Sequence, residues 1–183
     1  QLAAARVRSG GRVLLVSAEE SASQVRLRAD RLDAVLDDLW LAGDASVEAI
    51  LAHADRLQPD LLIVDSVQTV HLEADSGSPG SASQVRGCAQ RLVVEAKARG
   101  MATLLVGHVT KDGSLAGPKL LEHVVDTVLE LTGDRHHALR MLRVVKHRFG
   151  PTDEVGLFEM GGDGLWSVDD PSRLFLADRS TDV

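Results

Sequence analysis

Two hydrophobic patterns alternate along this chain. Short continuous apolar runs predict strands that are covered on both faces, and apolar residues that recur every three or four positions predict amphipathic helices. In the first part of the chain, strand-like runs alternate with helix-like segments, and strand-like segments then follow one another directly. The predicted strands are 13–16, 40–41, 61–65, 102–108, 127–131, 138–149, 154–160 and 164–168. This order predicts an α/β fold, with a mostly parallel β-sheet flanked by helices and antiparallel strands at the C-terminal edge.

The segments between the early strands carry helix signals. Ser21 and Gln24 have the spacing of a capping box. Gly100 suits the end of a long helix, and Pro118 suits the first position of a short one. Core-facing stripes are expected at Ala22, Val25, Ala29, Leu32 and Leu36, at Val47, Ile50, Leu51, Ala54 and Leu57, and at Val85, Cys88, Leu92 and Ala96.

Composition limits the kind of protein this is. With 183 residues, 44% of them hydrophobic and 26% charged, the chain is long enough for one domain, which we expect over 1–175, with 176–183 as a polar tail or linker. Cys88 is the only cysteine, which excludes an internal disulfide or thiolate zinc site and favours a reducing, cytoplasmic setting. No apolar run approaches the roughly 20 residues of a membrane span, so no membrane partner is expected.

Polar residues follow several of the predicted strands. Glu19 and Glu20 come after the first, Asp65 ends the third and His108 ends the fourth. In α/β sheets, ligands bind beyond the carboxyl ends of the strands. An aspartate after four apolar residues is typical of a Walker B group, which holds the water shell of nucleotide-bound Mg²⁺. By itself the pattern also fits an aspartate that only caps the next turn.

Two cations stand two positions apart in "RVVKHRFG", residues 143–150. If this run is a strand, Lys146 and Arg148 lie on one face, where they repel each other unless an anion lies opposite. The alternative is that both are solvated cations at a strand end. The sequence therefore raises the question of which anion they meet.

Six segments, taken together, resemble the ATPase domain of the bacterial RadA (Sms) family of the RecA superfamily. They are "VSAEESASQVRLRADRL", "PDLLIVDSVQTV", "GSASQVRGCAQRL", "LLVGHVTKDGSLAGPKLLEHVVDTVLEL", "GDRHHALRMLRVVKHRFG" and "VGLFEM". "KHRFG" matches the family's Lys-Asn-Arg-Phe-Gly motif, with His147 in place of Asn. The resemblance covers nearly the whole chain in order and implies a RecA-like sheet.

The resemblance implies an activity and partners. The family consists of ATPases of DNA repair and recombination that use ATP and Mg²⁺ and act on single-stranded or branched DNA. RecA-like ATPases assemble into rings or filaments with ATP between neighbouring subunits, and we expect a homo-oligomeric ring, a hexamer. A recombinase or a replicative helicase is an expected protein partner.

The same resemblance assigns roles to individual residues. Glu19 matches the position that polarises the attacking water, with Glu20 as the alternative. His108 matches a sensor of the γ-phosphate, although a hydrogen-bonded histidine at a strand end is the simpler reading. Asp65 and Ser66 are the expected contacts to the nucleotide, and Asp65 is the expected contact to Mg²⁺ through water. Lys146 and Arg148 are expected to reach the γ-phosphate bound by the neighbouring subunit.

Two loops match the DNA-facing loops of RecA-like proteins. The first, 71–83, is acidic, whereas the second, 110–119, carries Lys111 and Lys119 and is the better candidate. The formal net charge of −7 argues against a broad grip on nucleic acid, so binding would depend on a local basic loop or a ring of copies. Ordinary surface loops are the alternative.

A P-loop is absent from these residues. No match to G-x-x-x-x-G-K-[ST] occurs, and "QLAAARVRSGG" reads as the back half of a helix, so we expect a fragment that starts just after the P-loop and is inactive alone. The family's zinc module and Lon-protease-like domain are also not matched. The alternatives to a motor are a nonenzymatic RecA-like protomer or scaffold and a replicative-helicase-like ATPase.

Overall fold

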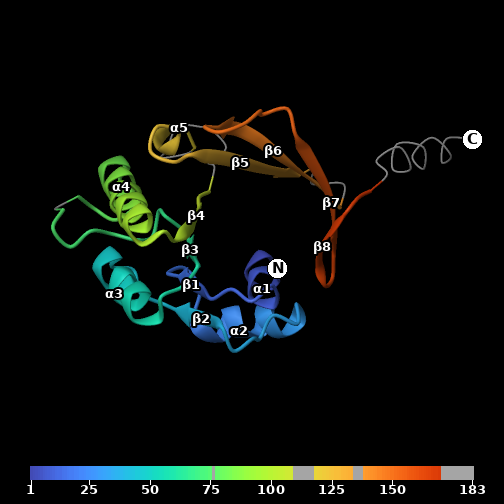
Figure 1. Ribbon diagram of the computed structural model, residues 1–183, viewed down its shortest axis with the longest axis horizontal. Helices are drawn as coiled ribbons and strands as arrows, with labels where there is room; N and C mark the ends of the chain where they lie inside the picture. Colours follow the sequence, from blue (N-terminus) through green and yellow to red (C-terminus); the bar gives the residue numbers. More distant parts are fainter. Residues whose placement is uncertain (76, 109–117, 134–137, 170–183) are drawn as a thin grey trace, which may run out of the picture. The chain divides into compact units, whose positions relative to one another are not determined.

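The computed structural model describes residues 1–75, 77–108, 118–133 and 138–169 (Figure 1). The chain divides into two compact units, Gln1–Val125 and Asp126–Val183. The first unit contains α1 (Leu2–Arg8), β1 (Val13–Ser17), α2 (Ala22–Arg31), β2 (Leu39–Ala42), α3 (Val47–Leu57), β3 (Leu61–Asp65), α4 (Ala82–Arg99), β4 (Ala102–Val106) and α5 (Pro118–Leu121). The second contains β5 (Thr127–Gly133), β6 (Leu139–His147), β7 (Val155–Gly161) and β8 (Gly164–Ser167).

The first unit is built on a parallel sheet with the strand order β2-β1-β3-β4. Ser17 at the end of β1 pairs with Asp65 at the end of β3, and Asp65 pairs with Val106 at the end of β4. The three strands therefore finish in register, and the segments that follow them start from one edge of the sheet.

The core of the first unit lies between this sheet and helices α3 and α4. It includes the expected stripe of α4, in which Val85, Cys88 and Leu92 have no exposed surface. Burial, together with the nearby carboxylates of Glu48 and Asp75, raises the pKa of the Cys88 thiol to about 11. Cys88 is thus a core residue, as the sequence predicted. Helix α1 packs against β1, β2 and β3 and buries Ala4.

Helix α2 differs from the sequence prediction. The capping box of Ser21 and Gln24 is present, but the helix ends at Arg31 and buries none of its residues. Val25 and Ala29 of the expected stripe are only half-buried. The apolar stripe has the expected helical period, but the predicted burial of this stripe in the core is wrong within α2.

The second unit is an antiparallel sheet with the order β5-β6-β7-β8. A register shift between Val128 and Leu129 interrupts the pairing of β5 with β6, and a tight turn joins β7 to β8, where Gly161 pairs with Gly164. The antiparallel strands were predicted at the edge of one sheet, and the structure gives them a sheet of their own. The α/β fold class is confirmed. Within the described residues, no helix is both long and apolar enough to cross a membrane.

A buried glutamine fixes the chain that leads from β3 into α4. Gln84, only 1% exposed, lies in the first turn of α4. Its side-chain nitrogen donates to the carbonyl oxygens of Leu72, Asp75 and Gly77 at 3.3, 2.8 and 3.0 Å, and its oxygen accepts from the Leu72 N–H at 3.0 Å. One side chain therefore satisfies four backbone groups of the acidic loop.

Replacing Gln84 with leucine should destabilise the protein by about 3 kcal/mol, because four backbone groups lose their partner while the volume is nearly retained. Urea unfolding followed by circular dichroism measures the loss. Gln90→Leu, at an exposed position of the same helix, is the matched control and should change stability by less than about 0.5 kcal/mol. Equal effects of the two substitutions would show that the Gln84 hydrogen bonds contribute nothing.

Candidate active site

The carboxyl edge of the parallel sheet collects three of the residues singled out by sequence. Glu19 lies two residues after β1, Asp65 is the last residue of β3, and His108 lies two residues after β4. Because these strands end in register, short connections bring the three residues to one place. The sequence predicted a shared edge, and the backbone provides it.

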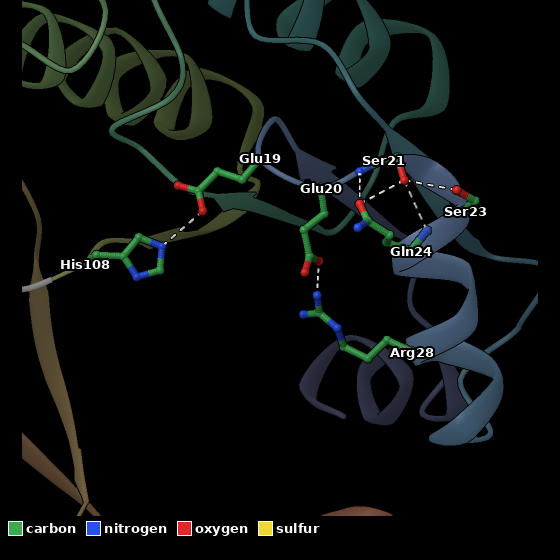
Figure 2. A network of polar contacts seen from close by, with 7 residues as sticks. All are labelled: Glu19, Glu20, Ser21, Ser23, Gln24, Arg28 and His108. Atoms are coloured by element: carbon green, nitrogen blue, oxygen red, sulfur yellow. Dashed lines mark hydrogen bonds and ion pairs between the residues drawn. The ribbon is translucent and has the colours of Figure 1, made fainter.

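Glu19 is the centre of this cluster. Its Oε1 accepts a hydrogen bond of 2.5 Å from the Ser66 hydroxyl, and its Oε2 lies 3.4 Å from Nε2 of His108. Figure 2 shows the Glu19 carboxylate and the His108 ring directed at each other. The Glu19 and His108 side chains are 38% and 62% exposed, so a ligand can approach both from solvent.

Glu20 takes another direction. Its carboxylate pairs with the guanidinium of Arg28 on α2, away from His108 (Figure 2). Ser21 is the N-cap of α2, so Glu20 precedes the helix and does not lie in its first turn. Of the two adjacent acids, Glu19 contacts residues that follow β3 and β4, namely Ser66 and His108.

The turn after β3 is anchored on both sides. The Val67 N–H donates to the Val106 carbonyl at 2.9 Å, and the Thr69 hydroxyl donates to the Ser66 carbonyl at 2.8 Å. Gln68 donates from its side-chain nitrogen to the His108 carbonyl at 3.2 Å. No sequence signal singles out Gln68 or Thr69, because Gln68 contacts a backbone group 40 positions away and Thr69 contacts a backbone group of its own turn.

The donor set at this edge suits Mg²⁺ bound together with a nucleotide. Asp65 ends β3 and Glu19 follows β1, so both place carboxylate oxygen atoms, which are hard ligands, at this edge. Among the described residues, no group of three or more His, Cys, Asp or Glu side chains forms a metal cage. Mg²⁺ in nucleotide sites needs none, since it uses one or two carboxylates, water and phosphate oxygens.

Lys146 and Arg148 belong to the second unit. Lys146 pairs with Val128 in the β5–β6 ladder, and Arg148 follows the end of β6. Nη1 of Arg148 lies 2.7 Å from Oδ1 of Asp126, and the Arg148 N–H donates to the Asp126 carbonyl at 2.9 Å. Arg148 thus already has one carboxylate partner in its own chain.

His147, which replaces the Asn of the family motif, also has a hydrogen-bond partner in its own chain. Nδ1 of His147 lies 2.9 Å from the Thr127 hydroxyl, and its ring meets Phe149 edge-on at 6.4 Å between centroids. The imidazole therefore makes a hydrogen bond across the β5–β6 ladder.

The expected DNA-facing residues are described only in part. Lys111 and the side chain of Lys119 lie outside the described part of the chain, although the backbone of Lys119 belongs to α5. In the first loop, the His71 backbone forms a bridge with Ser46, and the Ser46 hydroxyl donates to Glu73 at 2.9 Å. This loop is thus tied to the start of α3 and presents acidic groups.

Comparison with known proteins adds independent findings. A family model described as an AAA domain matches residues 2–114. The DNA repair protein RadA of Streptococcus pneumoniae is 50% identical over 169 residues, which are 92% of this chain and 40% of that protein. RadA of Bacillus subtilis is 48% identical over 172 residues, 94% of this chain and 38% of that protein. The chain therefore spans well under half the length of these relatives.

A solved structure shares the fold. A KaiC-like protein of the hyperthermophilic archaeon Pyrococcus horikoshii superposes with a TM-score of 0.66, covering 88% of this chain and 78% of that chain at 16% identity. At this identity the match concerns the fold alone. The family match and the RadA sequences agree with the resemblance found from the motifs. The chain belongs to the AAA domain family, and its relatives there include the bacterial DNA repair proteins named RadA.

Proposed function

We propose that the protein containing this chain is a DNA-dependent ATPase of DNA repair and homologous recombination, acting as a motor on single-stranded or branched DNA. The observation that carries the proposal is the meeting of Glu19, Asp65 and His108 at the carboxyl edge of one parallel sheet. A carboxylate base, a second carboxylate and an imidazole at such an edge suit the hydrolysis of a nucleoside triphosphate. The RadA relatives support the link to DNA repair.

In this proposal Glu19 polarises the attacking water. Its carboxylate would accept a hydrogen bond from the water and take up the proton that the water loses as it attacks the γ-phosphate, as a general base does. Asp65 would hold the water shell of Mg²⁺, which when bound neutralises charge on the phosphates. His108 would donate a hydrogen bond to the γ-phosphate and carry the nucleotide state into the segment that follows it.

Lys146 and Arg148 would complete a site on the neighbouring subunit of a ring, for which a hexamer is the expected form. The opposing anion would then be a phosphate held by another copy, and the guanidinium, with five N–H donors, can bind it beside Asp126. Such an arginine stabilises charge that develops during phosphoryl transfer.

DNA would be held through its phosphates by a ring of loops that carry Lys111 and Lys119. With no Tyr, three Phe and two Trp, the chain has few side chains on which bases can stack. Binding of this kind is strongly salt dependent. A recombinase or a replicative helicase that works on the same DNA is the proposed protein partner.

The second candidate is a nonenzymatic RecA-like protomer that acts as a scaffold. The lack of a P-loop in the whole protein would favour it, because the P-loop backbone and lysine bind the phosphates. The two candidates differ in whether the protein containing this chain hydrolyses ATP.

Glu19→Gln in that protein should lower kcat for ATP hydrolysis by about 10² to 10⁴ with nucleotide affinity retained, because it removes the base and leaves the side-chain shape. Phosphate release and binding of a fluorescent nucleotide measure the two quantities. Glu20→Gln is the matched control and should leave kcat within about twofold, since Glu20 pairs with Arg28. The reverse ranking would make Glu20 the base.

Arg148→Ala should lower DNA-stimulated turnover by about 10³ to 10⁵, the usual effect of losing an arginine that acts in trans. Mixing Arg148→Ala with Glu19→Gln subunits should then restore part of the activity, because some interfaces combine an intact Glu19 with an intact Arg148. Steady-state turnover over a series of mixing ratios measures the recovery. A mixture no more active than its two components would contradict the trans role.

The 183-residue chain alone should release no phosphate above background, with or without single-stranded DNA, because it has no P-loop to bind the triphosphate. A malachite-green assay at saturating ATP and Mg²⁺ measures this. Robust turnover by the isolated chain would require another phosphate cradle within these residues.

A further inference from the structure

Ser66 has a contact that its sequence position did not suggest. The residue follows the Walker B-like Asp65 directly, and the family resemblance pointed to a nucleotide contact. In the structure its side chain is completely buried, at 0% exposure. Its hydroxyl donates its proton to Oε1 of Glu19 across 2.5 Å, within the short range of hydrogen bonds to a charged carboxylate.

Ser66 is itself held firmly. Its carbonyl accepts hydrogen bonds from the Thr69 N–H at 3.2 Å and from the Thr69 hydroxyl at 2.8 Å. The next residue, Val67, donates its N–H to the end of β4 at 2.9 Å. A donor held in this way by β3, β4 and the turn that follows β3 gives an exposed glutamate a defined direction.

Glu19 needs such a partner. It lies beyond the end of β1, outside any helix or strand, and its side chain is 38% exposed. A glutamate in this setting has several rotamers of similar energy. Its second oxygen meets His108 at 3.4 Å, and that side chain is itself 62% exposed. Ser66 is therefore the buried partner of Glu19, and His108 is the accessible one.

We propose that Ser66 is a positioning residue that holds the Glu19 carboxylate in the orientation needed to polarise water, and that it does not bind the nucleotide directly. The inference rests on the proposed ATPase function and deepens it. Its physical basis is that a hydroxyl with no exposed surface cannot touch a ligand, whereas it already touches the base. Small errors in the position of a reacting group cost large factors in rate.

The test is a double-mutant cycle in the full-length protein containing this chain. Ser66→Ala should lower kcat for ATP hydrolysis by about 10-fold to 100-fold, while KM and the affinity for Mg²⁺-ATP stay within about twofold. In a Glu19→Ala background, Ser66→Ala should have no further effect, because the group it positions is gone. Ser66→Thr keeps the hydroxyl and should recover part of the lost kcat.

The matched control is Ser17→Ala. Ser17 is also buried, at 5% exposure, and pairs with Asp65 in the adjacent strand. Its substitution removes a hydroxyl from the same region without touching the Glu19 carboxylate, so kcat should stay within about twofold. Thermal unfolding of both variants separates loss of folding from loss of catalysis. A crystal structure of Ser66→Ala should show the Glu19 carboxylate in more than one orientation.

Distinct results overturn the inference. Weaker Mg²⁺-ATP binding by Ser66→Ala at unchanged kcat would make Ser66 a nucleotide ligand. An equal fall of kcat in the wild-type and Glu19→Ala backgrounds would mean that Ser66 acts independently of Glu19. In both cases, a low kcat of the Glu19→Ala variant would still support the proposed role of Glu19 as the base. Wild-type turnover by Glu19→Ala would overturn the base and the positioning role together.

Discussion

The in-register parallel pairing of β1, β3 and β4 is the constraint on which the candidate site depends. Ser17, Asp65 and Val106 end their strands side by side, so each following segment starts at the same edge of the sheet. A shift of one strand by one residue would turn its side chains to the other face. The core between the sheet and helices α3 and α4 opposes such a shift, because the shift would remove Leu14, Leu62 or Val64 from that core.

At this edge, polar groups with different exposure to solvent meet. Ser66 is buried and fixed by the turn after β3, whereas Glu19 and His108 are partly open to solvent. A rigid donor beside an accessible acid combines orientation with access for a ligand. Gln68 adds a second link from the same turn, because it donates to the His108 carbonyl. One short turn thereby contacts the Glu19 side chain and the His108 backbone.

The cations of the second unit have a similar local anchor. Arg148 binds Asp126 through both its backbone N–H and its guanidinium, which holds it near the start of β5. His147, in place of the family Asn, hydrogen-bonds Thr127 on the opposite strand. The motif "KHRFG" therefore has structural contacts in its own chain, apart from any role at a neighbouring nucleotide.

The sequence by itself determined the elements and their order. Apolar runs located β1, β3 and β4, and the caps of Ser21 and Gly100 gave helix ends that the structure reproduces, because these signals act within a few residues. The sequence did not predict that α2 lies on the surface, because its apolar stripe has the correct period although none of its residues is buried. It also could not give the separate antiparallel sheet. Only the tertiary structure decided that Glu19 meets Ser66 while Glu20 turns to Arg28, since adjacent acids are equivalent until strand register brings one of them a buried donor 47 positions away.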